Sequence, residues 1–329
     1  MPPLSGMRVL VTGGTGFIGS HLVEGLLERD CKIRVLAHQN SREIVGNLEA
    51  LPASQRNDLE IVFGDIRDPF RVDQAVEGCE VVFHLAALVA IPYSYGAPHS
   101  YVETNVMGTL NLLEAGRKHG TQRFVHTSTS EVYGSASYVP MDERHPLQGQ
   151  SPYSASKIAA DQLVEAYHRS YDLPVAVLRP FNTFGPRQSA QAIIPAIVTQ
   201  ALQGANVMLG SLSPIRDFTF VEDTVTAFLA IAECDEAVGR VVNIGNGRGI
   251  AMGDLAARIL RLMNREGRCR VSKDETRVRP SRSEVLRLVC DNTLARDLLK
   301  WEPTADLDEG LRRTIEYFTA HAHHSPREG

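Results

Sequence analysis

Short apolar runs alternate with longer amphipathic stretches through the first half of this 329-residue chain. Strands are predicted at 8–12, 32–37, 59–63, 81–85, 123–127 and 175–178. Helices are predicted at 20–29, at 103–118 and from Tyr153 onward. Near-continuous Val, Ile and Leu in the strands, separated by helices, are typical of a parallel sheet that helices cover on both faces. The chain is therefore predicted to be an α/β protein with a doubly wound parallel sheet.

The pattern changes after about residue 180, where Pro and Gly become frequent up to residue 215. Helices are predicted at 191–203 and 254–264, and the apolar run 241–244 is expected to return to the sheet. A chain of this length suits one large domain or two closely joined ones. We expect a first domain of residues 1–180, rejoined by 217–248, a smaller, discontinuous α/β substrate domain formed by 181–216 and 249–320, and a flexible tail at 321–329.

Composition argues against several classes of function. The 34 Lys and Arg residues and 39 Asp and Glu residues give a formal net charge of −5, which disfavours nucleic-acid binding. The five cysteines are scattered without a Cys-x-x-Cys pair, so neither a disulfide framework nor a zinc site is expected. The chain contains no apolar run long enough for a membrane span and no signal-peptide pattern at its start. We therefore expect a cytoplasmic protein without a metal site, and a solvated tail is favoured over metal binding for His321, His323 and His324.

Three glycines stand between the first predicted strand and the first predicted helix. Gly13, Gly16 and Gly19 have the spacing G-x-x-G-x-x-G. In this position the first permits a tight turn, the second lets the backbone approach a pyrophosphate, and the third lets the helix pack on the strand. N–H groups of the helix N-terminus then face the anion. The turn predicts a Rossmann domain that binds a dinucleotide through Gly13, Gly16, Phe17, Ile18 and Gly19, with an ordinary strand–helix turn as the alternative.

The residues after the second strand bear on the choice of dinucleotide. An acid about 20 residues beyond the glycines would bind the ribose 2′-hydroxyl of NAD, but the stretch 36–42 contains none. Asn40, Ser41 and Arg42 instead suit a 2′-phosphate, so NADP is favoured and NAD is the alternative. Asp65 and Ile66 follow the third strand, where Asp65 is expected to meet the adenine or, alternatively, to cap the next turn.

Tyr153 and Lys157 occupy positions i and i+4 of a predicted helix and therefore lie on one face of it. An ammonium beside the phenol stabilises the phenolate and lowers a pKa that starts at about 10. Tyr153 is thus a candidate base at neutral pH, and Lys157 is also a candidate to hold the nicotinamide ribose. Such a pair alone would usually be a surface pair, but this one follows a dinucleotide turn and a strand end rich in Ser and Thr.

Seven stretches together resemble the extended short-chain dehydrogenase/reductases that act as nucleotide-sugar epimerases and dehydratases. They are 13–19, 84–87, 103–106, 128–134, 153–157, 179–187 and 216–218, which span nearly the whole chain. The resemblance implies a tightly bound, internally recycled NADP or NAD that also contacts Leu85, Ala86, Ala87 and Asn105. It further implies a homodimer in which 103–118 and 153–170 form a four-helix bundle with the second subunit.

The resemblance also implies a first step in which Tyr153 removes the proton of the sugar 4-hydroxyl as hydride leaves C4, while Thr129 hydrogen-bonds the 4-oxygen. A 4,6-dehydratase must then remove the C5 proton and expel the 6-hydroxyl, and Glu131 supplies the carboxylate that this needs. Ser130 stands where dTDP-glucose 4,6-dehydratases have the Asp that serves as acid. Either Glu131 acts as both base and acid, or Ser130 relays a proton. A solvated loop residue is the alternative for Glu131.

A nucleoside diphosphate sugar presents two phosphate charges, for which arginine is the fitting partner. The resemblance assigns the diphosphate to Arg216, joined by Arg279 or Arg282, and assigns Asn182 to the sugar or the near phosphate. Arg187 is assigned to the same substrate site.

The stretches 140–152 and 181–188 are most similar to bacterial nucleotide-N-acetylglucosamine 4,6-dehydratases of the legionaminic-acid-pathway type, and Ser130 also matches GDP-mannose 4,6-dehydratases. The predicted function is therefore a 4,6-dehydratase that converts an NDP-hexose, with NDP-N-acetylglucosamine as a candidate, to a 4-keto-6-deoxy sugar nucleotide. An NDP-sugar 4-epimerase and a UDP-glucuronate decarboxylase are the alternatives, and a non-catalytic NADP-sensing Rossmann protein is a distant one.

Overall fold

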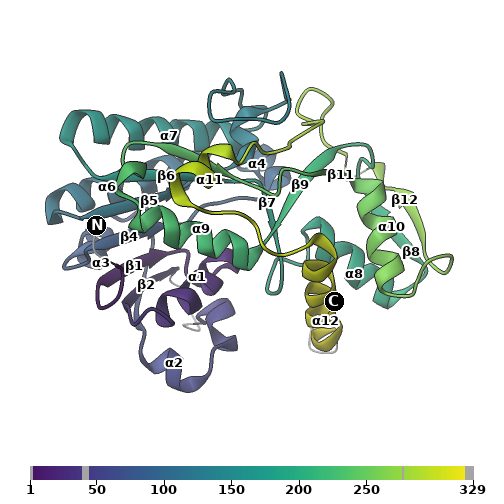
Figure 1. Ribbon diagram of the computed structural model, residues 1–329, viewed down its shortest axis with the longest axis horizontal. Helices are drawn as coiled ribbons and strands as arrows, with labels where there is room; N and C mark the ends of the chain where they lie inside the picture. The colour runs from purple at the N-terminus through teal and green to yellow at the C-terminus, as the bar shows by residue number, and fades with distance from the viewer. Residues whose placement is uncertain (1–2, 39–43, 276–277, 323–329) are drawn as a thin grey trace.

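The computed structural model describes residues 3–38, 44–275 and 278–322 of the chain (Figure 1). Among these residues the central sheet has seven strands, all parallel, in the order β10-β6-β5-β4-β1-β2-β3. They are β1 (Arg8–Thr12), β2 (Lys32–His38), β3 (Glu60–Gly64), β4 (Val81–His84), β5 (Arg123–Thr127), β6 (Val175–Pro180) and β10 (Val241–Ile244). The strand order reverses between β1 and β4, and such switch points are where these sheets bind ligands. The predicted doubly wound parallel sheet is confirmed.

Helices cover both faces of this sheet, which explains why most side chains of its strands are apolar and buried. The main covering helices are α1 (Phe17–Leu27), α3 (Pro69–Val76), α6 (Gly108–His119), α7 (Pro152–Tyr171) and α9 (Val221–Glu233). Val9 and Val11 of β1 belong to the core that includes residues of α1 and α9, whereas Leu10 belongs to the core on the side of α3, α6 and α7. Successive strand residues point to opposite faces, and all three of these side chains are fully buried.

The predicted helix 103–118 is present, but the helical stretch starts earlier and is not α-helical throughout. It runs through α5 (Pro98–Tyr101), then η2 (Val102–Met107) with a π-helical backbone, and then α6. The remaining short helices on the sheet side are η1 (Gly46–Ala50), α2 (Ala53–Asn57), α4 (Ile91–Gly96), η3 (Ser130–Tyr133) and η4 (Asp235–Ala237).

A second, smaller unit lies beside the carboxyl ends of β6 and β10 (Figure 1). Its strands are β7 (Asn182–Phe184), β9 (Ile215–Phe220) and β11 (Gly249–Ala251), which form one sheet, and β8 (Asn206–Leu209) and β12 (Arg270–Lys273), which form another. Its helices are α8 (Ile193–Gln203), α10 (Met252–Leu262) and α12 (Leu307–His321), which share one hydrophobic core with these strands. Helix α12 reaches His321, the first residue of the expected flexible tail, and residues 323–329 lie outside the described residues.

The chain passes between the two units at positions that differ from the expected boundaries. Strand β9 belongs to the small three-stranded sheet, although residues from 217 were expected in the first domain. Helix α11 (Thr293–Leu299) and Trp301 pack into the core of the central sheet, although 249–320 was expected in the second domain. Trp301 explains this return, because its indole Nε1 donates hydrogen bonds to the Asp223 carbonyl and to Thr226 Oγ1 of α9, both at 3.0 Å.

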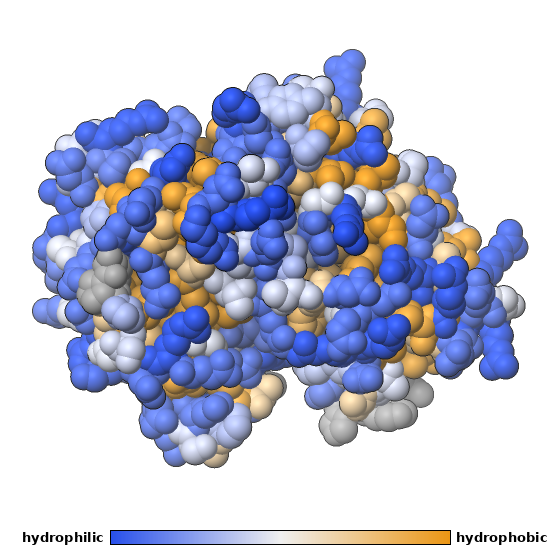
Figure 2. Space-filling model, viewed as in Figure 1, coloured by the Kyte–Doolittle hydropathy of each residue, from blue (hydrophilic) through white to orange (hydrophobic). Residues whose placement is uncertain are grey.

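Polar residues cover most of the face seen in Figure 2, and hydrophobic residues appear between them as separate patches. In the described part of the chain, no helix is both long enough and apolar enough to cross a membrane. All five cysteines carry free thiols.

Candidate active site

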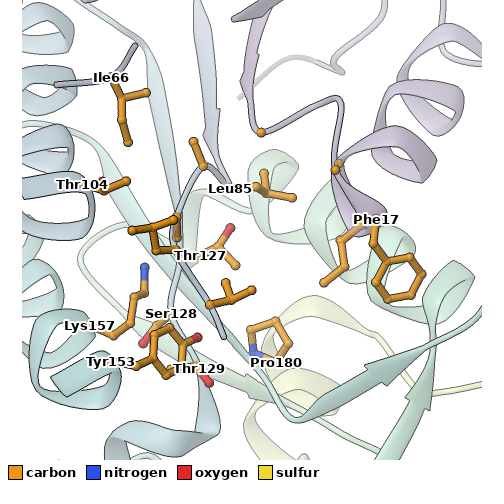
Figure 3. A pocket seen from close by; sticks show the side chains of 18 of the residues that line it. Phe17, Ile66, Leu85, Thr104, Thr127, Ser128, Thr129, Tyr153, Lys157 and Pro180 are labelled. Atoms are coloured by element: carbon orange, nitrogen blue, oxygen red, sulfur yellow. The ribbon is translucent and has the colours of Figure 1, made fainter. Parts of the chain in front are cut away.

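A cavity of about 700 Å³ opens at the carboxyl ends of β1, β4, β5 and β6, between the two units (Figure 3). This volume lies in the range typical of ligand and cofactor sites. Residues of the glycine turn line one side and residues of η3 and α7 line the other, as the positions of Phe17 and Tyr153 in Figure 3 show. The cavity therefore joins the predicted dinucleotide site and the predicted catalytic residues in one space.

The glycine turn has the geometry that a pyrophosphate needs. Gly13 has a φ of +73°, and a Cβ there would lie 2.7 Å from the backbone N of Ala86. A Cβ on Gly19 would lie 2.1 Å from the Gly13 carbonyl oxygen. Helix α1 begins after Gly16 without a side-chain cap in the described structure, so its first N–H groups stay available to an anion. Gly13, Gly16, Phe17, Ile18 and Gly19 all line the cavity, and this wall fits a dinucleotide.

A buried histidine fixes the loop that follows β4 against the turn. The Thr109 hydroxyl donates to the Asn105 carbonyl at 2.6 Å, so Thr109 Oγ1 accepts from His84 Nε2 at 3.0 Å. His84 Nδ1 then accepts from the Thr12 hydroxyl at 2.9 Å, and Thr12 Oγ1 accepts from the Ala86 N–H at 3.2 Å. Burial holds the pKa of His84 well below its ordinary value, which keeps the ring neutral as this chain of bonds requires. These hydrogen bonds hold the stretch 84–87 in place, and its residues Leu85, Ala86 and Ala87 line the cavity.

Asn105 does not line the cavity, contrary to its predicted role at the cofactor. Its side chain is 1% exposed, accepts from the Leu88 N–H at 2.8 Å, and donates to the Leu88 carbonyl at 3.0 Å and to Ser156 Oγ at 2.9 Å. These three bonds use its hydrogen-bonding groups inside the protein. Asn105 therefore connects Leu88, which lines the cavity, to Ser156 of α7.

Asp65 caps the following turn, as the alternative expected, and its contact with an adenine stays a prediction. It lines the cavity together with Ile66. The cap forms because its carboxylate accepts from the Arg67 N–H at 2.9 Å and from Arg67 Nη2 at 2.6 Å. The hydrogen bond from Arg67 lowers the pKa of Asp65, so the carboxylate is charged. Arg67 and His38 also line this end and were missed from the sequence, while Asn40, Ser41 and Arg42 lie outside the described residues.

Tyr153 and Lys157 lie in the first turns of α7, and both side chains line the cavity. This helix begins with a capping box between Ser151 and Ser154, and Pro152 occupies its first turn. The side chains of Tyr153 and Thr129 both line the cavity and lie side by side in Figure 3. The predicted i, i+4 pair and its neighbour Thr129 are therefore brought together as expected.

The predicted lowering of the tyrosine pKa by lysine is wrong for the ligand-free protein. Burial raises the pKa of Tyr153, and the neighbouring Thr129 hydroxyl offsets only part of this rise. Burial lowers the pKa of Lys157 to about 8, against the opposite pull of Asp161. The physical reason lies in the geometry: the Lys157 ammonium projects into the cavity rather than toward the phenol (Figure 3).

Beneath these residues lies a buried charged cluster that the sequence analysis missed. Asp161 accepts from Ser128 Oγ at 2.6 Å and from Arg179 Nη2 at 2.7 Å, and His126 Nε2 lies 3.3 Å from its other oxygen. Arg179 also donates to Tyr133 Oη at 2.7 Å. Burial alone would raise the pKa of Asp161, but His126 and Arg179 hold it well below its usual range. The position of Asp161, one helical turn after Lys157, was the available signal.

Glu131 and Ser130 follow Thr129 on η3 and both line the cavity. The Thr129 side chain accepts from the Glu131 N–H at 3.3 Å and so caps this short helix. Ser130 is 3% exposed. The Glu131 side chain is 13% exposed, and its Oε1 lies 3.7 Å from Arg279 Nη1. Glu131 is thus a mostly buried carboxylate that lines the cavity, and it is not a solvated loop residue.

The predicted substrate residues divide into two groups. Asn182 lines the cavity with a buried Oδ1 that lacks a hydrogen-bond partner among the described residues, and Arg216 and Arg279 lie near Glu284 and Glu131. Arg187 instead pairs with Glu24 and His21 of α1, away from the other predicted substrate residues, and its role at the substrate stays a prediction.

Arg282 is exposed, and its backbone carbonyl accepts from Gln150 Nε2 at 3.2 Å. Arg279 is more buried and lies near enough to Arg216 for their charges to interact, so of the two candidates to join Arg216 the structure favours Arg279. Among the described residues, no three His, Cys, Asp or Glu side chains are grouped to hold a metal ion.

Comparisons with known proteins agree with this geometry. A family model described as GDP-mannose 4,6 dehydratase matches residues 10–314. A dTDP-glucose 4,6-dehydratase from Streptomyces antibioticus is 35% identical over 321 residues, which cover 95% of this chain and 92% of the relative. A UDP-glucose 4-epimerase from Mycolicibacterium smegmatis is 35% identical over 320 residues, which cover 95% and 98%.

Among solved structures, the dTDP-glucose 4,6-dehydratase DesIV from Streptomyces venezuelae, with NAD bound, is similar with a TM-score of 0.86 and 32% identity. The similarity covers 95% of this chain and 97% of that one. The chain therefore belongs to the GDP-mannose 4,6 dehydratase family, among the extended short-chain dehydrogenase/reductases that act as nucleotide-sugar dehydratases and epimerases.

Proposed function

We propose that the protein is a nucleotide-sugar 4,6-dehydratase. The observation that carries this proposal is the Glu131 carboxylate, which lines the same cavity as Tyr153, Thr129 and Lys157. A 4-epimerase needs only a base and a hydride carrier, whereas loss of water across C5 and C6 also needs a group that takes the C5 proton. The overall reaction converts an NDP-hexose to a 4-keto-6-deoxy sugar nucleotide and one water molecule.

We propose NADP as the cofactor, with NAD as the alternative. The glycine turn, the uncapped start of α1, and Asp65 and Ile66 at the far end would hold its pyrophosphate and adenosine. When bound, the nicotinamide supplies the acceptor for the hydride from C4 and the donor that returns this hydride to C6. NADP is supported by the stretch 36–42, which lacks an acid. NAD is supported by the DesIV structure, which has NAD bound.

In this proposal Tyr153 takes the proton of the sugar 4-hydroxyl, and Thr129 holds the 4-oxygen. Their position side by side in the cavity supports the assignment, because both groups must reach one oxygen atom. The buried Lys157 would hold the nicotinamide ribose, and its positive charge would help Tyr153 release its proton once both sides of the cavity are filled. Its pKa of about 8 leaves it mostly charged at neutral pH.

The 4-keto group makes the C5 proton acidic, and we propose that Glu131 removes it. The 6-hydroxyl then leaves as water, after it has received a proton from Glu131 or through Ser130. When hydride returns to C6, C5 takes up a proton, which balances the proton that Tyr153 removed from the 4-hydroxyl. The buried position of Ser130 next to Glu131 supports the relay as a second route. The substrate diphosphate would bind Arg216 and Arg279, Asn182 would bind the sugar or the near phosphate, and NDP-N-acetylglucosamine is the proposed substrate.

We also propose that the protein is a homodimer in which α6 and α7 form a four-helix bundle with the second subunit. Exposed hydrophobic side chains support it: Val102 and Met107 of η2, directly before α6, are 51% and 47% exposed, and Tyr171 at the end of α7 is 54% exposed. Size-exclusion chromatography with light scattering tests this proposal.

The decisive experiment incubates the protein, with NADP or NAD, with UDP-, GDP- and dTDP-linked glucose, mannose and N-acetylglucosamine and with UDP-glucuronate. Mass spectrometry is expected to detect loss of one water from one of these sugars. An isomer of unchanged mass would identify a 4-epimerase, which the similarity to the M. smegmatis enzyme supports as the second candidate. Loss of CO2 from UDP-glucuronate would identify a decarboxylase. Cofactor binding without turnover of any of these sugars would support the remaining alternative, a non-catalytic protein that senses NADP.

A further inference from the structure

Two arginines and two carboxylates lie close to one another beside the cavity, and one of them, Glu131, lines it. Arg279 Nη1 lies 3.7 Å from Glu131 Oε1, and Arg216 Nη2 lies 3.9 Å from Glu284 Oε1. All four side chains are mostly buried, with exposures of 25% and 13% in the first pair and 7% and 16% in the second. Each arginine that the proposed function gives to the diphosphate thus already has an anionic neighbour.

Both pairs are held by charge and not by hydrogen bonds. Their distances exceed the 2.7–3.2 Å of an N–H···O bond, and a charge-assisted bond would be shorter still. Arg279 Nη1 is buried without a hydrogen-bond acceptor among the described residues. Arg216 donates through Nη1 to the carbonyl of its neighbour Ile215 at 3.1 Å. A buried guanidinium has five N–H donors, so both arginines keep donors for a better acceptor.

Phosphate oxygens are such an acceptor, since arginine binds them in a bidentate manner. A phosphate that binds either guanidinium repels the carboxylate beside it, because both groups carry negative charge and no hydrogen bond holds the carboxylate in place. Glu131 also acts on both arginines and on the catalytic tyrosine: its charge favours the protonated form of Arg216 and raises the pKa of Tyr153. A change in the partner of Glu131 therefore alters the electrostatic environment of both Arg216 and Tyr153.

We propose that Glu131 and Glu284 are counter-ions that occupy Arg279 and Arg216 in the ligand-free protein, and that the diphosphate of the substrate displaces them. The inference rests on the proposed function, because it takes the diphosphate site from it. Displacement leaves Glu131 without its cation at the moment when the sugar is bound beside it. The diphosphate thereby couples substrate binding to release of the carboxylate that must take the C5 proton, and Glu284 becomes a functional residue that the sequence analysis did not identify.

Coupling between two ligands is reciprocal, so a carboxylate that the diphosphate displaces must itself weaken diphosphate binding. Glu131→Gln and Glu284→Gln keep the side-chain shape and remove the charge. Each variant is expected to bind a nucleoside diphosphate about fivefold more tightly than the native protein. Glu266→Gln is the control, because Glu266 pairs with Arg261 at the surface and its loss changes the net charge equally.

The experiment is isothermal titration of the full-length protein and its variants with UDP, GDP and dTDP, which needs no turnover. Arg279→Gln is expected to weaken binding, and in that background Glu131→Gln should no longer tighten it. Equal or weaker binding by Glu131→Gln, in a native protein that does bind a nucleoside diphosphate, overturns the inference and leaves the proposed function standing. If none of the three nucleotides binds the native protein, the proposed function is overturned together with the inference.

Discussion

Arg179 Nη2 donates a hydrogen bond to Asp161 Oδ2 at 2.7 Å in the interior of the protein, where these side chains are 2% and 0% exposed. The same oxygen accepts from Ser128, which lines the active-site cavity, and Asp161 lies one turn after Lys157 on α7. This pair therefore joins β5, β6 and α7 directly under the catalytic residues, and the fold and the site depend on the same charges.

Asp161→Asn is expected to lower the free energy of unfolding by about 3–5 kcal/mol, because it leaves a buried guanidinium without its counter-charge. Urea unfolding followed by the fluorescence of Trp301 measures this loss, since Trp301 is the one tryptophan of the chain and is buried. Asp73→Asn is the control: its carboxylate pairs with Lys118 and His119 at the surface and should contribute far less. Equal losses in the two variants would contradict the role given to Asp161.

Lys157 should make stability depend on pH in the alkaline range. Its pKa falls from 10.5 to about 8 in the folded protein because of burial. Between these values the unfolded chain binds a proton that the folded protein does not, so the contribution of Lys157 to stability rises as pH increases. At pH below about 8 the buried charge is a full cost of about 3 kcal/mol.

Lys157→Met removes this cost, so the variant is expected to be more stable than the native protein at neutral pH. The difference should shrink as the pH rises from about 8 toward 10.5, the interval between the folded and ordinary values. Urea unfolding of both proteins across this range measures the difference. A difference that stays constant with pH would mean that Lys157 has an unperturbed pKa in the ligand-free protein.

Patterns in the sequence predicted the sheet and the residues that local geometry brings together. Apolar strands predicted the doubly wound sheet because both faces of β1 are buried, and helical spacing placed Tyr153 and Lys157 on one face of α7. Spacing contains no information about contacts between distant segments. Arg187 pairs with Glu24, and Asn105 with Leu88 and Ser156, through folding of the whole chain. The same holds for the approach of Arg279 to Glu131, which only the structure reveals.

Variants of Arg187 and Arg216 can distinguish an arginine that stabilises the fold from one that binds the substrate diphosphate. Arg187→Gln is expected to destabilise the protein by about 1–3 kcal/mol, because the buried guanidinium joins the second unit to Glu24 and His21 of α1. It should leave the affinity for a nucleoside diphosphate unchanged. Arg216→Gln is expected to weaken that affinity about tenfold or more, since a charged hydrogen-bond donor to the phosphates is lost. Titration calorimetry and urea unfolding of both variants separate the two roles, and loss of nucleotide affinity in Arg187→Gln would support its predicted place in the substrate site.

Arg42 tests the choice of dinucleotide that the sequence favours. If NADP is the cofactor, Arg42→Ala is expected to raise the Kd for NADP about tenfold or more, because a guanidinium that meets the 2′-phosphate is lost. The Kd for NAD should change little, since NAD lacks this phosphate. Quenching of the reduced cofactor's fluorescence in competition with each dinucleotide gives both constants. Tighter binding of NAD than of NADP by the native protein would identify NAD as the cofactor.

Glu131 distinguishes dehydration from epimerisation at the level of single steps. In Glu131→Gln the cavity should keep its shape, Tyr153 and Thr129 should keep their places in it, and oxidation at C4 should proceed. Removal of the C5 proton should then be slower by about 10²–10⁴-fold, because the general base is lost. Reduced cofactor is expected to accumulate in single-turnover absorption measurements, while mass spectrometry detects little loss of water.

Ser130→Ala separates the two routes for the departing hydroxyl. If Glu131 alone serves as base and acid, this variant keeps most of its rate. If Ser130 relays the proton, it loses water slowly and also accumulates reduced cofactor. Dehydration by Glu131→Gln at the native rate would contradict the proposed role of the carboxylate. Release of a C4 epimer by the native protein would instead assign it to the epimerases of its family.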